Sequence, residues 1–520
     1  MPPGLLLDPR TVGAAKVAVA LATAALLVWD LRARSAASPR SPLRDRLLAA
    51  LGVAGLACWW NLFAFQFPGF AHPSETFHYY LGAKYFPELG YTRLYECIAA
   101  ADAEAGLDPA SLRRPMRDLA SNELTTTDAV LAEPSRCTAH FEAARWSEFR
   151  HDVDFLRGLV PPRRWNSFQQ DHGYNATPAW TLLGHVVTDT GPVSLAQLRV
   201  LWALDPLLLL ALGAGAVWGF GWRLAAVAAV YFGTNYLSPY NWTGGAILRQ
   251  DWLAASVLGV ALLRRGRPAA GGACIAWATL LRVFPGCLLA GIGLGAAWRM
   301  ARERSLRLRP AELRFAVGAG GVLVLGFAVS SAAAGGPSRW LEFAERSRVQ
   351  LATPLANHVG LVTALSYDAN SRSELARDPS LGDPMARWKE ARRERFAERW
   401  LIFAAVAATF GLLLARAAGG QPLWIGAALG AALVPVALEL TGYYWSLLLI
   451  LAFLGERRPA IGPALCLFGI SGYAVSELWH WTDEIHVVVS VLGVALAFLA
   501  VWLCRPAGPS HGRDAAALGG

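Results

Sequence analysis

Long apolar segments recur from one end of this chain to the other, and they restrict its fold more than any other feature. Hydrophobic residues make up 55% of the 520 residues and charged residues only 16%, which is a poor composition for several water-soluble domains. In lipid, a helix satisfies its own backbone hydrogen bonds over such lengths. The sequence therefore predicts an all-α polytopic membrane protein.

The apolar segments predict about thirteen transmembrane helices and two large extracytoplasmic loops. An extra first helix is expected at 13–29. The other twelve are expected near residues 47–67, 195–217, 224–238, 247–263, 269–284, 286–299, 315–334, 400–416, 422–438, 442–455, 460–476 and 486–504. The large loops cover 68–180 and 335–398, and residues 505–520 are predicted to form a disordered cytoplasmic tail.

Arginines cluster in the short connections between the apolar segments. Six lie between residues 299 and 314 alone. By the positive-inside rule these connections are cytoplasmic, which places both large loops outside and accounts for the net charge of +9 without a nucleic-acid partner. The alanine- and arginine-rich composition is typical of a high-GC bacterium, so we expect the bacterial inner (plasma) membrane and a site that faces the periplasm.

Ionisable residues beside the predicted spans are the candidates for chemistry, because charge at membrane depth is costly. Glu75 follows the second apolar segment and is our candidate catalytic residue. Arg249 and Arg282 lie near the outer ends of later segments, and Asn357 and His358 lie in the second large loop. The other candidates on the same side of the membrane are polar or aromatic, namely His78, Tyr79, Tyr80, Tyr443 and Tyr444.

Each candidate also has a purely structural interpretation. Glu75 can be a solvated loop carboxylate, or a favourable charge at the start of a helix that Ser74 caps. Arg249 can form an ion pair elsewhere in the bundle, and Arg282 can extend to the membrane interface. His358 can be an ordinary surface histidine.

The seven cysteines show no spacing typical of a metal site. Cys97 and Cys137 share the first large loop. If that loop is extracytoplasmic, the two thiols can either form a disulfide or stay free.

The stretch that begins at Glu75 resembles the GT-C superfamily of integral-membrane glycosyltransferases, and most of all its polyprenyl-phosphate-mannose-dependent mannosyltransferases. In that branch an acidic residue after an early span is followed by a tyrosine, small residues and a Gly-x-x-Leu-Tyr ending. The matching residues here are Glu75, Tyr79, Gly82-Ala83 and Gly90-Tyr-Thr-Arg-Leu-Tyr95, with one extra residue in the last piece.

Three later segments extend the resemblance over most of residues 47–455. Leu281-Arg282-Val-Phe-Pro285 resembles the family's basic-residue-to-proline element. The segment 357–365 resembles its Asn-Gln-Ser-Leu segment, and Tyr443-Tyr444-Trp445 stands where relatives often have His-His-Trp. The chain departs from the pattern in having Glu for the commoner Asp, His-Val for Gln-Ser, and Tyr-Tyr for the histidine pair.

The resemblance implies a GT-C-like catalytic region at 47–455, preceded by an extra helix and linker at 1–46 and followed by C-terminal helices at 456–504. It implies transfer of a hexose, mannose most of all, from a polyprenyl-phosphate donor to an extracytoplasmic lipid or glycan acceptor, with inversion and with Glu75 as the general base. The donor phosphate would be bound by Arg282, Arg249 and His358, and the sugar or acceptor by His78, Tyr79, Tyr80, Asn357, Tyr443 and Tyr444. Some GT-C enzymes use a divalent metal, but Glu75 has no acidic neighbour in the sequence, so we expect no cofactor.

Three other functions stay open. The first is a membrane transferase for another group, such as an acyl or phosphoethanolamine group, although no matching nucleophile stands out in the sequence. The departures from the family pattern fit a non-catalytic scaffold that keeps the GT-C fold. A transporter or flippase for a lipid-linked substrate could use the same charged residues as a path, although no internal repeat supports it.

Overall fold

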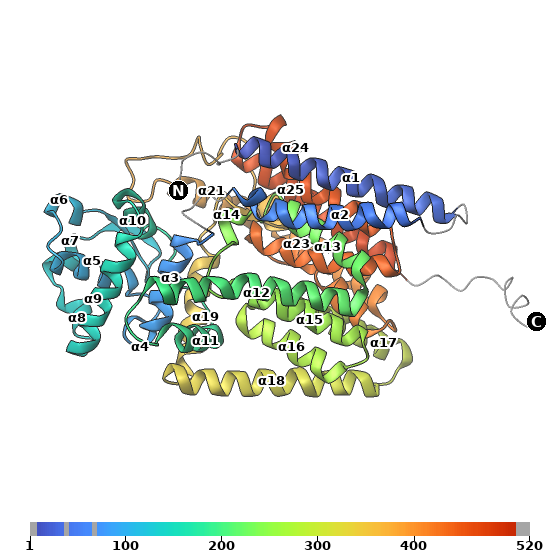
Figure 1. Ribbon diagram of the computed structural model, residues 1–520, viewed down its shortest axis with the longest axis horizontal. Helices are drawn as coiled ribbons and strands as arrows, with labels where there is room; N and C mark the ends of the chain where they lie inside the picture. Colours follow the sequence, from blue (N-terminus) through green and yellow to red (C-terminus); the bar gives the residue numbers. More distant parts are fainter. Residues whose placement is uncertain (1–7, 36–40, 65–69, 506–520) are drawn as a thin grey trace, which may run out of the picture.

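The computed structural model describes residues 8–35, 41–64 and 70–505, and most of them are helical. Figure 1 shows two parts: a bundle whose long helices run along the longest axis, and a cap of short elements at one end of that bundle. The first helix, α1 (Pro9–Ser35), begins at the cap end. The elements that form the cap follow α2 directly in the chain.

The bundle contains long helices and several short apolar ones. After α1 its members are α2 (Pro42–Trp59), α12 (Leu195–Phe220), α13 (Trp222–Thr234), α15 (Asp251–Arg264), α16 (Pro268–Leu281), α17 (Gly286–Glu303), α18 (Pro310–Ala334), α21 (Ala386–Ala418), α22 (Leu423–Gly430), α23 (Leu433–Ala437), η2 (Gly442–Glu456), α24 (Ile461–Leu478) and α25 (Thr482–Cys504). A helix lies at or near each of the thirteen predicted segments.

Six helices among the described residues are long and apolar enough to cross a membrane: α1, α12, α18, α21, α24 and α25. They support an all-α membrane protein, whereas the expected thirteen crossings are not confirmed. Helices such as α13, α15 and α22 are shorter than the roughly 20 residues that a full crossing requires. These short helices pack inside the bundle instead of facing lipid along their whole length.

Small residues allow the bundle helices to pack closely. The backbones of α2 and α13 approach so near that a Cβ atom on Gly233 would lie 1.8 Å from the carbonyl oxygen of Gly55. Such contacts replace the hydrophobic driving force that is absent between helices in lipid.

The cap is built from short helices and one two-stranded sheet. Its elements are α3 (Pro73–Lys84), α4 (Phe86–Leu89), α5 (Leu94–Glu104), α6 (Pro109–Leu112), β1 (Pro115–Asp118), β2 (Glu123–Thr126), α7 (Asp128–Ala132), α8 (Ser135–Thr138), α9 (Ala143–Gly158), α10 (Pro162–Phe168) and α11 (Pro178–Thr188). The strands pair in an antiparallel register that places Pro115 opposite Thr126.

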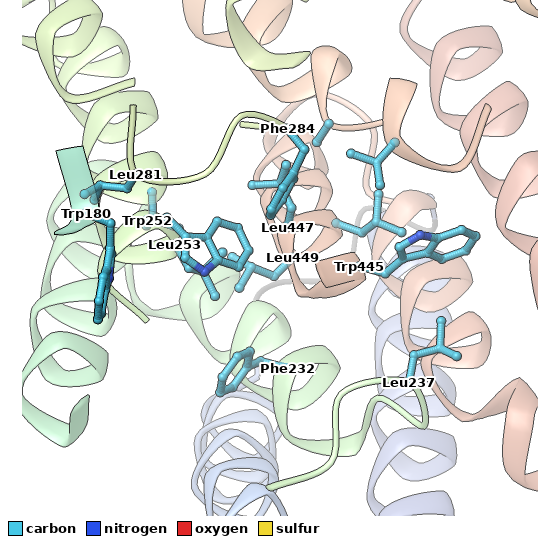
Figure 2. Packing of buried hydrophobic residues seen from close by; sticks show 14 of the residues in the cluster. Trp180, Phe232, Leu237, Trp252, Leu253, Leu281, Phe284, Trp445, Leu447 and Leu449 are labelled. Carbon is cyan, nitrogen blue, oxygen red and sulfur yellow. The ribbon is translucent and has the colours of Figure 1, made fainter. Parts of the chain in front are cut away.

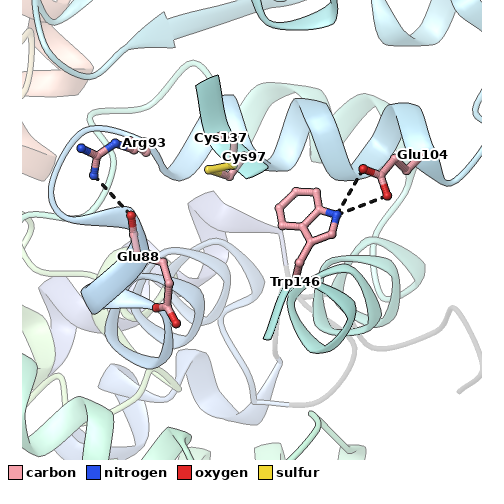
Figure 3. The surroundings of a disulfide bond; sticks show 6 residues. All are labelled: Glu88, Arg93, Cys97, Glu104, Cys137 and Trp146. Atoms are coloured by element: carbon pink, nitrogen blue, oxygen red, sulfur yellow. Dashed lines mark hydrogen bonds between the residues drawn. A yellow bond between two sulfur atoms is a disulfide. The ribbon is translucent and has the colours of Figure 1, made fainter. Parts of the chain in front are cut away.

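A disulfide and buried ion pairs hold the cap together. Cys97 on α5 and Cys137 on α8 form the disulfide that the sequence left open, next to Trp146 (Figure 3). The ammonium of Lys84 lies 2.6 Å from a carboxylate oxygen of Asp152, and both side chains are fully buried. Satisfied buried pairs of this kind rigidify the elements that carry them.

The segment between α18 and α21 joins the bundle through a small sheet. It contains α19 (Ser338–Leu351), β3 (His358–Val359) and α20 (Leu361–Leu365). The strand β3 pairs antiparallel with β4 (Leu440–Thr441), so that His358 lies opposite Thr441. This pairing brings the loop to the start of η2.

Candidate functional site

Glu75 lies in the first turn of α3, which begins at Pro73 and is capped by His72. The Nδ1 atom of His72 accepts the backbone N–H of Glu75 at 3.2 Å, and its Nε2–H donates to the carbonyl oxygen of Asn241 at 2.8 Å. These contacts assign the neutral tautomer, because a carbonyl oxygen only accepts. Burial agrees with this assignment, since it lowers the pKa of His72. In the alternative structural interpretation of Glu75, the helix start is confirmed, whereas the capping residue is His72 and not Ser74.

The carboxylate of Glu75 pairs with Arg249 from a distant part of the chain. The Nη1 atom of Arg249 lies 3.1 Å from Oε2 of Glu75. The Arg249 side chain is 4% exposed, whereas that of Glu75 is 20% exposed. The contact lacks hydrogen-bond geometry, and Oε2 has no hydrogen-bond partner among the described residues. Glu75 is thus both paired and able to accept a proton.

The close approach of Gly245 to Phe70 brings Arg249 to α3. The loop before α15 passes so close to the start of α3 that a Cβ atom on Gly245 would lie 1.7 Å from the carbonyl oxygen of Phe70. Gly245 also has a φ of +68°, which a residue with a side chain rarely adopts. Its carbonyl oxygen accepts the backbone N–H of His72 at 2.8 Å. The loop is therefore held against the cap of α3.

Asp205 fixes the other side of the same loop. It lies fully buried on α12, and its Oδ1 atom accepts the backbone N–H of Gln250 at 2.9 Å. Gln250 directly follows Arg249, so this contact orients the arginine toward Glu75. The sequence analysis missed Asp205, although a carboxylate in an apolar segment just before Pro206 was a usable signal.

Arg282 supplies a second buried cation. It follows the last residue of α16 in an extended conformation. Its guanidinium lies 5.4 Å from the ring centre of Tyr79 and 5.8 Å from that of Trp180. In the described part of the chain, Arg282 has no ion pair within 4 Å and its Nε atom has no hydrogen-bond partner. Asp251, which also has an unpartnered buried oxygen, interacts with it only at longer range.

Aromatic rings surround both arginines. The Arg249 guanidinium lies 4.7 Å from the ring centre of Tyr443, 5.7 Å from that of Tyr444 and 5.9 Å from that of Tyr79. Tyr79 lies four residues after Glu75, on the same face of α3, and donates a hydrogen bond to Asn175 at 2.8 Å. Burial raises the pKa of Tyr79 to about 12, so its hydroxyl stays protonated at neutral pH.

An apolar floor supports this cluster. The ring of Tyr444 lies 4.7 Å from that of Phe284 and 6.1 Å from that of Trp252. Both residues belong to the buried core between the bundle helices, beside Leu281 and Leu447 (Figure 2). The low-dielectric surroundings strengthen the electrostatic interactions of the charges above them.

Two of the predicted residues lie outside the cluster. The Nε2 atom of His78 is 2.7 Å from the hydroxyl of Tyr95 and 3.2 Å from the carbonyl oxygen of Phe168, inside the cap. Tyr80 is completely buried and donates to the side chain of Gln197 at 2.9 Å. Their contacts explain them as parts of the cap core, in place of the predicted sugar or acceptor contacts.

His358 belongs to a second polar cluster. It is buried beside Glu439 and Arg392, and these two form an ion pair at 2.5 Å. Burial lowers the pKa of His358 to about 4, so the imidazole is neutral at pH 7. It lies with Glu439 and Arg392 and not with Arg249 and Arg282, and its Nδ1 atom has no hydrogen-bond partner among the described residues, so its role in binding a donor phosphate stays a prediction. Its neighbour Asn357 accepts the backbone N–H of Gly442 at 3.1 Å through its carbonyl oxygen.

A cavity of about 930 Å³ adjoins the cluster at Tyr443. Its wall also contains Asn241, which anchors His72, and Asn357 from the segment between α18 and α21. Ligand pockets commonly have volumes of about 300 to 1,000 Å³. The cavity is thus large enough for a sugar or for part of a lipid-linked substrate.

The cluster of Glu75, Arg249, Arg282, Tyr79, Tyr443 and Tyr444 combines one carboxylate, two cations and three phenol rings. Its main chemical feature is a set of buried polar atoms that lack hydrogen-bond partners among the described residues, namely Glu75 Oε2, Arg249 Nη2 and Arg282 Nε. Leaving such atoms unsatisfied is costly, so they point to a ligand with an anionic group and a proton to give up.

In the described ranges, no three His, Cys, Asp or Glu side chains are grouped so that they could hold a metal ion. Comparisons of the chain with protein-family profiles, with curated proteins and with solved structures found no match.

Proposed function

We propose that this protein is an integral-membrane glycosyltransferase that moves a hexose, mannose most of all, from a polyprenyl-phosphate carrier to a lipid or glycan acceptor. The observation that carries the proposal is a carboxylate, Glu75, that lies beside two buried arginines whose Nη2 (Arg249) and Nε (Arg282) atoms have no hydrogen-bond partner in the described chain. A carboxylate can remove a proton, buried arginines can bind a leaving phosphate, and aromatic rings can stack on a sugar. These three capacities together are what glycosyl transfer from a phosphate carrier requires.

Glu75 acts as the general base in the proposed reaction. It takes the proton of an acceptor hydroxyl while the hydroxyl oxygen forms a bond to the anomeric carbon. The bond from that carbon to the phosphate oxygen breaks on the opposite face, and the electron pair leaves with the phosphate, so the configuration inverts. A positioned base typically contributes about 100- to 10,000-fold to the rate.

Arg249 changes partner during this proposed cycle. In the structure it pairs with Glu75 through Nη1, while Nη2 has no hydrogen-bond partner in the described chain. A donor phosphate beside Arg282 would compete for the same guanidinium, because arginine binds phosphate oxygens in a bidentate manner. Donor binding would then leave the Glu75 carboxylate free to accept the proton of the acceptor.

We assign the cap end of the bundle to the extracytoplasmic side, in the inner membrane of a bacterium. The disulfide between Cys97 and Cys137 supports this orientation, because disulfides persist in oxidising compartments. The arginine-rich connection between α17 and α18 lies at the opposite end of the bundle (Figure 1), as expected for the cytoplasmic side.

The test is sugar transfer in membranes that contain the wild type or Glu75→Gln, with radiolabelled polyprenyl-phosphate mannose and polyprenyl-phosphate glucose as donors. We expect the wild type to transfer one of these sugars, and the variant to transfer it about 100-fold more slowly per amount of protein. Glu96→Gln, which changes a half-buried carboxylate on α5, is the matched control and keeps wild-type activity. Equal rates for Glu75→Gln and the wild type would remove Glu75 from the mechanism.

A further inference from the structure

Lys16 is a buried cation within the first membrane helix. It lies seven residues after the start of α1, or about 10 Å along the helix axis. Only 2% of the residue is exposed. Placing an ammonium ion in such surroundings is expensive unless an anion accompanies it, and ionisable residues inside membrane spans usually serve a function.

Lys16 has no anionic partner in the described part of the chain. The sequence contains three lysines. The ammonium of Lys84 lies 2.6 Å from Asp152, and that of Lys389 lies 2.6 Å from Asp383. No hydrogen bond or ion pair joins the Lys16 side chain to any described residue, so the chain itself does not compensate this charge.

The side chain of Lys16 contributes to the wall of the 930 Å³ cavity. Among the described lining residues, the one carboxylate is Asp171. It accepts the backbone N–H of His172 at 2.8 Å, and the charge of Arg117 acts on it as well. Neither carboxylate oxygen of Asp171 forms an ion pair with Lys16. The lining of the same cavity also contains neutral hydrogen-bonding groups, which include Asn61, Asn241, Asn357 and Thr441.

The cavity and the Glu75 cluster share one wall. Tyr443 lines the cavity, and its ring also lies under the guanidinium of Arg249. Asn241 lines the cavity as well, and its carbonyl oxygen holds His72 at the start of α3. An occupant of the cavity would therefore be separated from the Glu75 cluster by the ring of Tyr443. Lys16 lies on α1, whereas the two arginines come from later parts of the chain.

We propose that Lys16 binds a phosphate group of a molecule that occupies this cavity. An ammonium is a compact charge that binds phosphate well, and amides and hydroxyls can donate to the remaining phosphate oxygens. The protein then has two phosphate sites, one at Lys16 and one at Arg249 and Arg282, with Tyr443 between them. The proposal concerns binding and does not depend on glycosyl transfer. Where the proposed function also holds, the occupant is the acceptor, which makes the acceptor a phosphate-bearing molecule.

Photolabelling of the purified full-length protein can test this site directly. The probe is a photoreactive polyprenyl phosphate, and mass spectrometry locates the labelled peptides. We expect labelling of α1 in the wild type, about tenfold less in Lys16→Met, and wild-type labelling in Lys16→Arg, which keeps the charge. Labelling near Arg282 should be the same in all three proteins. Unchanged labelling of α1 in Lys16→Met would overturn the proposal.

Two further measurements separate the remaining explanations. Without ligand, Lys16→Met should melt at a higher temperature than the wild type, because it removes an uncompensated buried charge. A lower melting temperature would show that Lys16 stabilises the bundle itself, and would count against the site.

A photoreactive polyprenol should label α1 weakly, since it lacks the phosphate; equal labelling would also overturn the proposal. Protection by an equal concentration of inorganic phosphate would assign the site to a water-soluble phosphate instead of a lipid headgroup.

Discussion

The Nη1 atom of Arg249 lies 3.1 Å from Oε2 of Glu75, and this ion pair joins the first turn of α3 to the loop before α15. The two residues are not equally exposed, since Arg249 is almost completely buried and Glu75 is not. Removal of Glu75 would leave an uncompensated charge in the protein, whereas removal of Arg249 would leave a carboxylate that water can reach. Substitution of Glu75 and substitution of Arg249 should therefore change the stability of the protein by different amounts.

We expect the two single substitutions in this ion pair to lower the stability of the protein by different amounts. Glu75→Gln should lower the unfolding free energy by about 1 to 3 kcal/mol, because the buried Arg249 loses its counter-charge. Arg249→Met should cost less, since Glu75 keeps contact with water. Thermal unfolding of both single variants and the double variant in detergent measures the coupling. Strictly additive effects would show that the two charges do not interact in solution.

Arg282 should control the affinity for the donor. In Arg282→Met, we expect kcat/KM for the polyprenyl-phosphate sugar to fall about 10- to 100-fold, because a buried charge-assisted contact to the phosphate is lost. The KM for the acceptor should stay within error of the wild type. Arg314→Met, at an exposed position on α18, is the matched control. An effect on the acceptor KM alone would place Arg282 at the acceptor instead.

The disulfide between Cys97 and Cys137 should stabilise the cap. The two residues are 40 positions apart, and closing such a loop restricts the unfolded chain by about 4 kcal/mol. Cys97→Ala with Cys137→Ala should lower the unfolding free energy by up to about this amount. Cys274→Ala, which removes a half-buried free thiol in α16, is the control.

His358 should make the protein less stable in mild acid. Its pKa is lowered to about 4 in the folded protein from an ordinary value of 6.5. The unfolded chain therefore binds a proton that the folded chain refuses between these two pH values, and the stability falls as the pH drops through this window. The expected loss is about 1.4 kcal/mol per pH unit near pH 5.

The control for this effect is the exposed His480. His358→Gln should flatten the dependence of melting temperature on pH between pH 6.5 and 5, whereas His480→Gln should leave it unchanged. A steep dependence in His358→Gln would assign the acid sensitivity to another group.

The sequence predicted the positions of the helices well, because apolar runs and turn residues act locally. A helix lies at or near each of the thirteen apolar segments, yet among the described residues six helices are long and apolar enough to cross a membrane. Hydropathy does not distinguish a span that faces lipid from a short helix enclosed by its neighbours. The expected number of crossings therefore went beyond what periodicity and composition can support.

The site was predicted in part. Glu75, Arg249, Arg282 and the tyrosines at 443 and 444 were named from the sequence because charges and aromatic residues beside apolar segments are unusual. Their mutual contacts were not predictable, since Arg249 reaches Glu75 only through the close approach of Gly245 to Phe70. His78 and Tyr80 are also polar or aromatic residues close to an apolar segment, but their side chains pack inside the cap.

The sequence by itself determined that this protein is helical, that its helices suit a membrane, and that its unusual charges gather beside the ends of apolar segments. Only the tertiary structure decided which of these charges meet. It paired Glu75 with Arg249, moved His358 into a separate cluster with Glu439, and left Lys16 alone in the wall of a cavity. The physical reason is that helix formation depends on neighbouring residues, whereas a site depends on how distant segments pack against one another.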